Sequence, residues 1–164
     1  MSTFVKGGST GTPFGKNEYL RSREGCKFES YTVAASTVVA RTIDGVAGQK
    51  ILQPGTVMAK ITSGGESGKI GPYSTDTVGV TDGRSAKENI VGILDTFLPW
   101  QLMERDVEVA VMYEGVAVQG WCIEMSLAQP SVGVAVTNAT ALAMQRHQQG
   151  AGTGAGKRVD ITWT

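Results

Sequence analysis

The fold class is decided by a stretch that opens with KILQPGTVMAKI, residues 50–61, and continues to residue 123. Pro54-Gly55 fits a type II turn, in which proline takes the second position and glycine the third, where φ is positive. After this turn Val57, Ala59 and Ile61 alternate onto one face, as they would in a strand. The stretch therefore predicts short β-strands that are separated by tight turns.

The segments on either side extend this pattern. Tyr31 to Ala40 is rich in β-branched residues and is followed by a predicted turn at Asp44-Gly45. A further turn is predicted at Asp82-Gly83, and Ile90 to Phe97 is an apolar run of the length of a buried strand. We therefore expect a small, mainly β domain.

The most specific local prediction is a β-hairpin that turns at Glu114-Gly115. Asp106 to Tyr113 and Val116 to Ile123 flank this dipeptide with alternating valines. A two-residue loop sets Val109 opposite Gly120, which places most of the valines on one face. The opposite face is mixed and includes Met112 and Trp121, so it offers apolar surface to a partner. These two residues are the candidate interface of a predicted homotrimer.

The first 25 residues predict an extended arm. Their glycines and irregularly spaced apolar residues do not fit a helix. Four apolar residues with nothing nearby in the sequence to bury them could anchor the arm on a partner, the alternative being a disordered terminus. These candidate anchors are Phe4, Phe14, Tyr19 and Leu20.

Residues 26–164 are predicted to form a single β-rich domain that ends in a helix and a strand. Thr137 or Asn138 is suited to cap a short C-terminal helix at about 138–149, and Gly150 follows where a C′ glycine belongs. A terminal strand is expected at about 158–163.

Composition excludes several classes of protein. The 15 basic and 15 acidic residues balance, and no basic cluster points to nucleic acid. No apolar run approaches the 18 residues that would suggest a membrane span, and residues 1–15 lack the apolar core of a signal peptide. Cys26 and Cys122 are too far apart in sequence for a zinc motif, and we expect them to be reduced thiols in a product of the cytoplasm.

The inventory of reactive residues predicts no enzyme, no metal and no cofactor. His147 is the one histidine, and it lies among alanines and glutamines rather than near a nucleophile. The carboxylates in the middle of the chain follow no spacing that would bring a catalytic pair together. These are Asp76, Asp82, Glu88 and Asp95.

The order of segments between residues 50 and 123 resembles the head decoration proteins of lambda-like tailed bacteriophages. The resemblance rests on Leu52 to Val57 with its Pro-Gly turn, the loop through Pro72-Tyr73, the strand Val91-Gly92-Ile93-Leu94, and the valines from Val107 to Val118. It implies a β-tulip that sits as a trimer on the outer capsid surface, made in the host cytoplasm and bound to the major capsid protein, with no catalytic role. The long arm and the tail from residue 137 depart from the family pattern.

Two other classes of function stay open. Trp100, Trp121 and Trp163 could stack on sugars in a carbohydrate-binding or adhesion module. A barrel enzyme whose carboxylates meet only in three dimensions is the second alternative.

Overall fold

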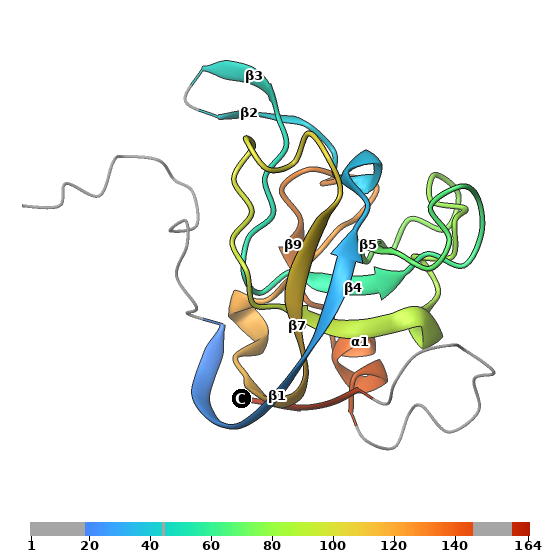
Figure 1. Cartoon of the computed structure of the whole chain (residues 1–164). Helices are drawn as coiled ribbons and strands as arrows, with labels where there is room; N and C mark the ends of the chain where they lie inside the picture. Colours follow the sequence, from blue (N-terminus) through green and yellow to red (C-terminus); the bar gives the residue numbers. More distant parts are fainter. Residues whose placement is uncertain (1–18, 44, 146–158) are drawn as a thin grey trace, which may run out of the picture.

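The computed structural model describes residues 19–43, 45–145 and 159–164. Within them the chain is mainly β with one short C-terminal helix, as predicted (Figure 1). The strands are β1 Leu20–Val33, β2 Arg41–Ile43, β3 Val46–Gln49, β4 Val57–Lys60, β5 Ile70–Pro72, β6 Ile90–Leu94, β7 Val107–Ala117, β8 Ile123–Glu124, β9 Val134–Ala135 and β10 Asp160–Trp163. The helix is α1, Asn138–Ala143, and the 3-10 turns are η1 Ala35–Thr37, η2 Lys87–Asn89 and η3 Gln119–Trp121.

Five of the strands pair in a closed ring. The main sheet has the order β1-β5-β4-β6-β7-β10, and β1 also pairs with β7. The contact that closes the ring is short, because β1 and β5 share a single residue pair, Val33 with Ile70. The arrangement is barrel-like, with β10 added in parallel beside the end of β7.

The predicted hairpin at Glu114-Gly115 is wrong. Both residues lie inside β7, which runs without a turn and pairs antiparallel with β1, so that Val109 lies opposite Tyr31 rather than Gly120. The dipeptide marks a change of partner, because β7 pairs with β6 up to Met112 and with β10 from Glu114 onward. A local rule cannot foresee this, since both partners are distant in sequence.

Packing explains why glycine is found at position 115. A Cβ atom there would lie 2.8 Å from both Cys26 Sγ and Met112 Sδ. Opposite this point the pairing of β1 is irregular between Ser22 and Lys27. The glycine therefore serves close packing of two strands instead of a turn.

The interior contains two apolar clusters. We call the first the central core, since all of its members lie between residues 33 and 111: Val33, Ala35, Val38, Leu52, Met58, Ile70, Val91, Leu94, Leu98, Met103, Val109 and Val111. We call the second the terminal core, since it reaches both ends of the described chain: Tyr19, Val57, Ala59, Tyr73, Ile90, Ile93, Met112, Ala117, Cys122, Val136, Ala141, Met144, Val159 and Ile161. Adjacent residues of β4 and β7 alternate between the two cores, as side chains on opposite faces of a sheet must.

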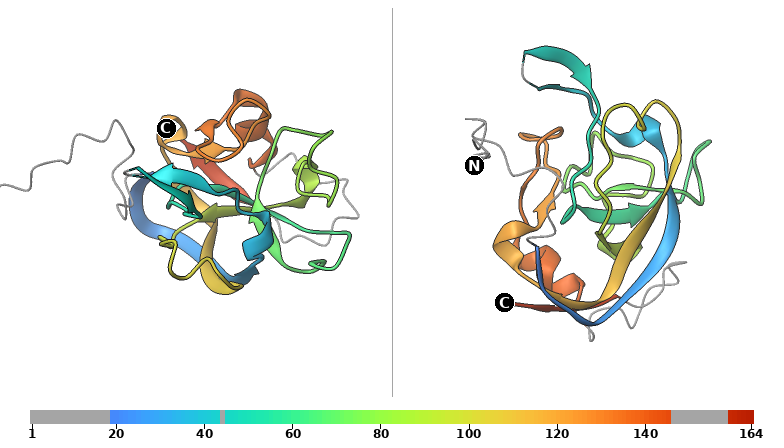
Figure 2. Two further views of the ribbon diagram at one scale, coloured as in Figure 1. Left: turned by 90° about the horizontal axis from the view of Figure 1, so that it is seen from above. Right: turned by 60° about the vertical axis from the view of Figure 1, so that its left-hand side comes forward.

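Other predicted elements are confirmed with altered bounds. Gly55 has φ 90° in the predicted turn, and the N–H of Thr56 bonds to the C=O of Gln53 at 3.3 Å. The predicted buried strand is β6, all of whose residues are buried. The hairpin of β2 and β3 reverses around Gly45 and projects from the body of the molecule (Figure 2).

Both ends of the domain differ from the prediction. Residues 19–25 were expected in the arm but belong to the domain, because Tyr19 is part of the terminal core and β1 begins at Leu20. The helix ends at Ala143, and Thr137 is its N-cap, with Oγ1 accepting a hydrogen bond from the N–H of Thr140 at 3.3 Å. Met144 and Gln145 follow the helix as a turn and a bend, residues 146–149 and Gly150 lie outside the described residues, and the terminal strand is present as β10.

Candidate interaction surface

Tyr19, the first residue that the structure describes, packs against the rest of the domain. Tyr19 is 1% exposed, and its hydroxyl donates a 2.5 Å hydrogen bond to Asp95 Oδ1. Burial raises the pKa of Tyr19, and the bond to Asp95 raises it further. Arg23 donates to both oxygens of the same carboxylate at 3.2 and 3.0 Å. This cluster fixes the start of β1 against the end of β6.

The expectation that nothing local buries the four arm residues is therefore wrong for two of them. Tyr19 belongs to the terminal core, and Leu20 is half-buried against it. Both side chains pack within their own domain, so they are poor candidates for anchors on another protein. Phe4 and Phe14 lie outside the described residues.

At Gly55 the backbone lies close to both Tyr19 and η3. A Cβ atom at this position would lie 3.1 Å from the backbone oxygen of Trp121 and 3.1 Å from Tyr19 Cβ. The N–H of Val118 also donates to the C=O of Tyr19 at 2.8 Å. Tyr19 thus lies beside Trp121.

Of the two residues predicted at the trimer interface, one is buried and the other is exposed. Met112 is fully buried in the terminal core, so it cannot contact another subunit, and its assignment to an exposed face is wrong. The error follows from the incorrect hairpin register. Trp121 is 51% exposed and lies in η3 rather than in a strand, so it stays available to a partner.

Further exposed apolar side chains follow Trp121 in the same part of the chain. Leu127 and Val132 lie between β8 and β9, and Leu142 lies on α1. These positions are 76%, 47% and 51% exposed. Large apolar groups at this exposure are typical of contact surfaces when they occur together. We call Trp121, Leu127, Val132 and Leu142 the η3–α1 residues; no motif in the sequence marks them.

Three of the four carboxylates considered for catalysis, Asp76, Asp82 and Asp95, are engaged in separate contacts, and the fourth, Glu88, is exposed on η2. Asp95 accepts from Tyr19 and Arg23, as described above. Asp76 Oδ1 accepts from the N–H groups of Val78 and Gly79 at 3.0 and 2.8 Å, which closes a turn. The structure therefore gives the three aspartates structural partners.

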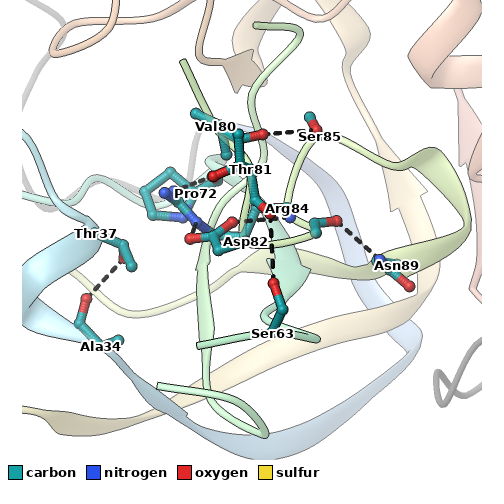
Figure 3. A network of polar contacts seen from close by, with 11 residues as sticks. Ala34, Thr37, Ser63, Pro72, Val80, Thr81, Asp82, Arg84, Ser85 and Asn89 are labelled. Carbon is teal, nitrogen blue, oxygen red and sulfur yellow. Dashed lines mark hydrogen bonds and ion pairs between the residues drawn. The ribbon is translucent and has the colours of Figure 1, made fainter. Parts of the chain in front are cut away.

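A polar network holds the long segment between β5 and β6 in place (Figure 3). Arg84 Nε donates to Asp82 Oδ2 at 2.8 Å, and its NH1 donates to the C=O of Pro72 at 3.0 Å. Asn89 Nδ2 donates to the C=O of Gly83 at 2.8 Å, at the predicted Asp82-Gly83 turn. The ionic and amide groups of this network have hydrogen-bond partners within the chain, so we interpret the network as structural.

Glu124 is the one buried carboxylate for which the described structure offers no hydrogen-bond partner. Its side chain is 0% exposed, and neither oxygen has a partner among the described residues. It lies in β8 opposite Val134, close to the terminal core. Buried polar groups are nearly always paired, so this residue stands out. Nothing in the sequence distinguishes it from an ordinary surface glutamate.

Other chemistry has little support in the described part of the chain. No group of three or more His, Cys, Asp or Glu side chains there could hold a metal ion. Cys26 and Cys122 are free thiols, and burial raises the pKa of Cys122 to about 12, which disfavours the reactive thiolate. His147 lies outside the described residues.

Comparison with known proteins adds no relative. No family model matches the chain, and neither the curated proteins nor the solved structures give a match. In the described residues no helix is both long and apolar enough to span a membrane.

Proposed function

We propose that the chain is a structural protein that binds the outer surface of a phage head as a homotrimer and stabilises the expanded shell. The observation that carries the proposal is the set of exposed apolar η3–α1 residues, of which Trp121 lies beside Tyr19. The resemblance of residues 50–123 to head decoration proteins supplies the class of partner, the major capsid protein. Neither nucleic acid nor a membrane is part of this proposal.

The physical basis of such a role is binding linkage. A protein that binds the assembled shell better than its loose subunits stabilises the shell by mass action. A trimer presents each contact three times, so modest affinities combine through effective concentration. Exposed apolar side chains such as Trp121 and Leu127 supply contact area without any catalytic group.

The arm keeps a place in the proposal in altered form. Phe4 and Phe14 stay as proposed anchors on the capsid, whereas Tyr19 and Leu20 are assigned to the domain. A truncation that tests the arm must therefore stop at residue 18. Removing residues 1–23 would also remove Tyr19 and Arg23, and it would test folding rather than binding.

Co-sedimentation with expanded phage heads that lack their decoration protein tests the proposal. The full chain should pellet with heads in a saturable manner, and deletion of residues 1–18 should weaken binding at least tenfold, about 1.4 kcal/mol. Trp121→Ser with Leu127→Ser should weaken it as well, whereas Glu108→Ser, at an exposed site on β7, should not. Absence of binding to any head by the full chain would refute the proposal.

Exposed tryptophans favour one alternative, a carbohydrate-binding or adhesion module on the virion surface. Trp100 and Trp121 are 42% and 51% exposed, and either ring could stack on a sugar. Trp163 is less suited, because it packs against the terminal core and its Nε1 donates to the C=O of Ala141 at 2.9 Å. Specific binding on a glycan panel that is lost in Trp100→Ser or Trp121→Ser would favour this alternative.

A further inference from the structure

The outer edge of β1 is an unpaired strand edge. One edge of β1 pairs with β7, and β5 meets the other edge only at Val33. Over residues 20–32 the second edge has no strand beside it among the described residues, and β1 runs along the outside of the molecule in the right-hand view of Figure 2. An open edge presents N–H and C=O groups that can pair with a strand of another chain.

Hydrogen bonds on the far side of β7 show how β1 is oriented. The N–H of Ala110 donates to Thr96 Oγ1 at 3.3 Å, and its C=O accepts from the N–H of Asp95 at 3.0 Å. Both groups of Ala110 therefore point away from β1. Ser30 lies directly opposite Ala110, so the two form a non-hydrogen-bonded pair. In such a pair the N–H and C=O groups of both residues point away from the partner strand. Ser30 therefore presents its N–H and C=O to the open edge.

The same alternation assigns the neighbouring residues. Phe28 and Thr32 lie two residues from Ser30, so their backbone groups also face the open edge. Ala34, the next residue in this series, confirms the direction, because its N–H donates to the C=O of Ile70 in β5 at 2.9 Å. The described structure gives the N–H and C=O groups of residues 28 and 30 no such partner, whereas Thr32 borders the bridge between Val33 and Ile70.

We infer that this edge pairs antiparallel with β1 of a second copy of the chain, about a two-fold axis at Phe28. In this register Lys27 lies opposite the partner's Glu29, and Glu29 lies opposite the partner's Lys27. Opposite charges placed directly across two strands stabilise their pairing. Moving the register by two residues in either direction separates both reciprocal pairs. The sequence of β1 is thus complementary to itself in the orientation that a two-fold axis requires.

Side-chain exposure agrees with this pairing. Ser30 and Thr32 are exposed, and Phe28 is half-buried with Arg23 placed 5.7 Å above its ring. Lys27 is 57% exposed and already lies 2.9 Å from Glu114 Oε2, so the pairing would place it between two carboxylates. Pairing would be short, because β1 is irregular between Leu20 and Lys27; at the shift between Lys27 and Phe28 the extra residue lies in β7. The two-fold contact should therefore form reversibly and depend on concentration.

This inference stands apart from the proposed function. A two-fold pair of free molecules uses β1, whereas the proposed trimer on a shell uses the η3–α1 residues. Failure of one leaves the other in place, because different residues carry them.

Substitutions at Ser30 test the open edge of β1 while the rest of the fold is kept. Ser30→Pro removes an outward N–H without breaking the ladder to β7, and prolines are tolerated on strand edges for this reason. Ser30→Ala keeps the N–H and is the matched control. In sedimentation equilibrium, the wild type and Ser30→Ala should show a concentration-dependent doubling of mass that Ser30→Pro lacks, with thermal unfolding showing that each variant is folded. A wild type that never doubles in mass, or a folded Ser30→Pro that still does, would overturn the inference.

A thiol cross-link tests the register. With the axis at Phe28, residue 30 lies opposite the partner's Cys26, at a spacing within the range of disulfides. Ser30→Cys treated with diamide, which takes up the two electrons and two protons, should give a disulfide-linked dimer on a non-reducing gel. Ser30→Cys with Cys26→Ser should give markedly less. Equal cross-linking of both variants, or none of either, would overturn the register and with it the self-complementarity of β1.

Discussion

The central core and the terminal core differ in how far apart in sequence their members lie. The central core draws only on residues 33–111, whereas the terminal core needs Tyr19 from one end of the domain and Ile161 from the other. Closing long loops costs conformational entropy, so contacts between distant segments form at greater entropic cost than local ones. The terminal core should therefore be the part of the domain that opens more easily, although both cores share β4, β6 and β7.

The largest effect on the free energy of unfolding is expected where β6 lies against β7, since both strands contribute to both cores. Gly92 in β6 has φ 143°, and a Cβ atom there would lie 2.1 Å from the backbone oxygen of Met112 in β7. Because backbone cannot move aside cheaply, Gly92→Ala should cost about 4 kcal/mol or more and disrupt both cores together. Gly120→Ala, where nothing lies within 4 Å, is the control and should be nearly neutral. Denaturant unfolding measures both, and a tolerated Gly92→Ala would contradict the close crossing.

The next largest effect on stability should distinguish the terminal core from the central core. Tyr19→Ala removes a buried ring and the hydroxyl that bonds to Asp95, and it should cost about 3–4 kcal/mol. Tyr19→Phe keeps the ring and should cost about 1.5 kcal/mol, the lower value for a bond to a charged group. Hydrogen exchange of folded Tyr19→Ala should accelerate in β10 more than around Leu52 and Leu98, which bridge in the central core. Equal acceleration in both places would show that the cores open as one unit.

A smaller effect of opposite sign is expected at Glu124. Since its buried carboxylate has no partner among the described residues, Glu124→Met should raise the free energy of unfolding by about 1–3 kcal/mol. Glu108→Met, at an exposed position on β7, controls for the change in charge and should be nearly neutral. Thermal denaturation at neutral pH measures the pair. A destabilised Glu124→Met would show that the carboxylate has a partner that stabilises the folded state.

The smallest effect concerns the edge of the central core. Asp106 Oδ1 accepts from the N–H of Ala35 at 3.0 Å, and its other oxygen pairs with Lys69. The hydrogen bond from Lys69, followed by that from Ala35, holds the pKa of Asp106 below the ordinary value of 3.8 for an aspartate. A lowered folded-state pKa gives stability that is present above the unfolded pKa and lost as the pH falls through the folded one.

Asp106→Asn should therefore lower the melting temperature slightly at pH 7, and the difference from the wild type should shrink below pH 3.8. Melting curves from pH 7 to pH 2 measure this dependence. A difference that is independent of pH would mean that the charge of Asp106 contributes nothing and that only its shape matters.

Several features follow from local sequence alone. The Pro54-Gly55 turn, the apolar strand β6, the Thr137 cap and the terminal strand β10 were all predictable, because each depends on neighbouring residues. Turn geometry, strand periodicity and capping are short-range effects, and they act in the same way wherever the segment lies in the fold. The mainly β class followed from these signals together.

Tertiary structure decided the rest. Glu114-Gly115 has the composition of a turn, yet it lies in a strand, because β1 on one side and β10 on the other supply distant partners for its backbone. Tyr19 was predicted to be an exposed anchor. It is buried, and its hydroxyl donates a hydrogen bond to Asp95, 76 residues away. The candidate interaction surface was likewise recognisable only in part, with Trp121 foreseen and Leu127 not. By itself the sequence determined where the chain could turn and extend; which strands meet, and therefore which side chains stay exposed to a partner, depends on contacts between residues that no local pattern connects.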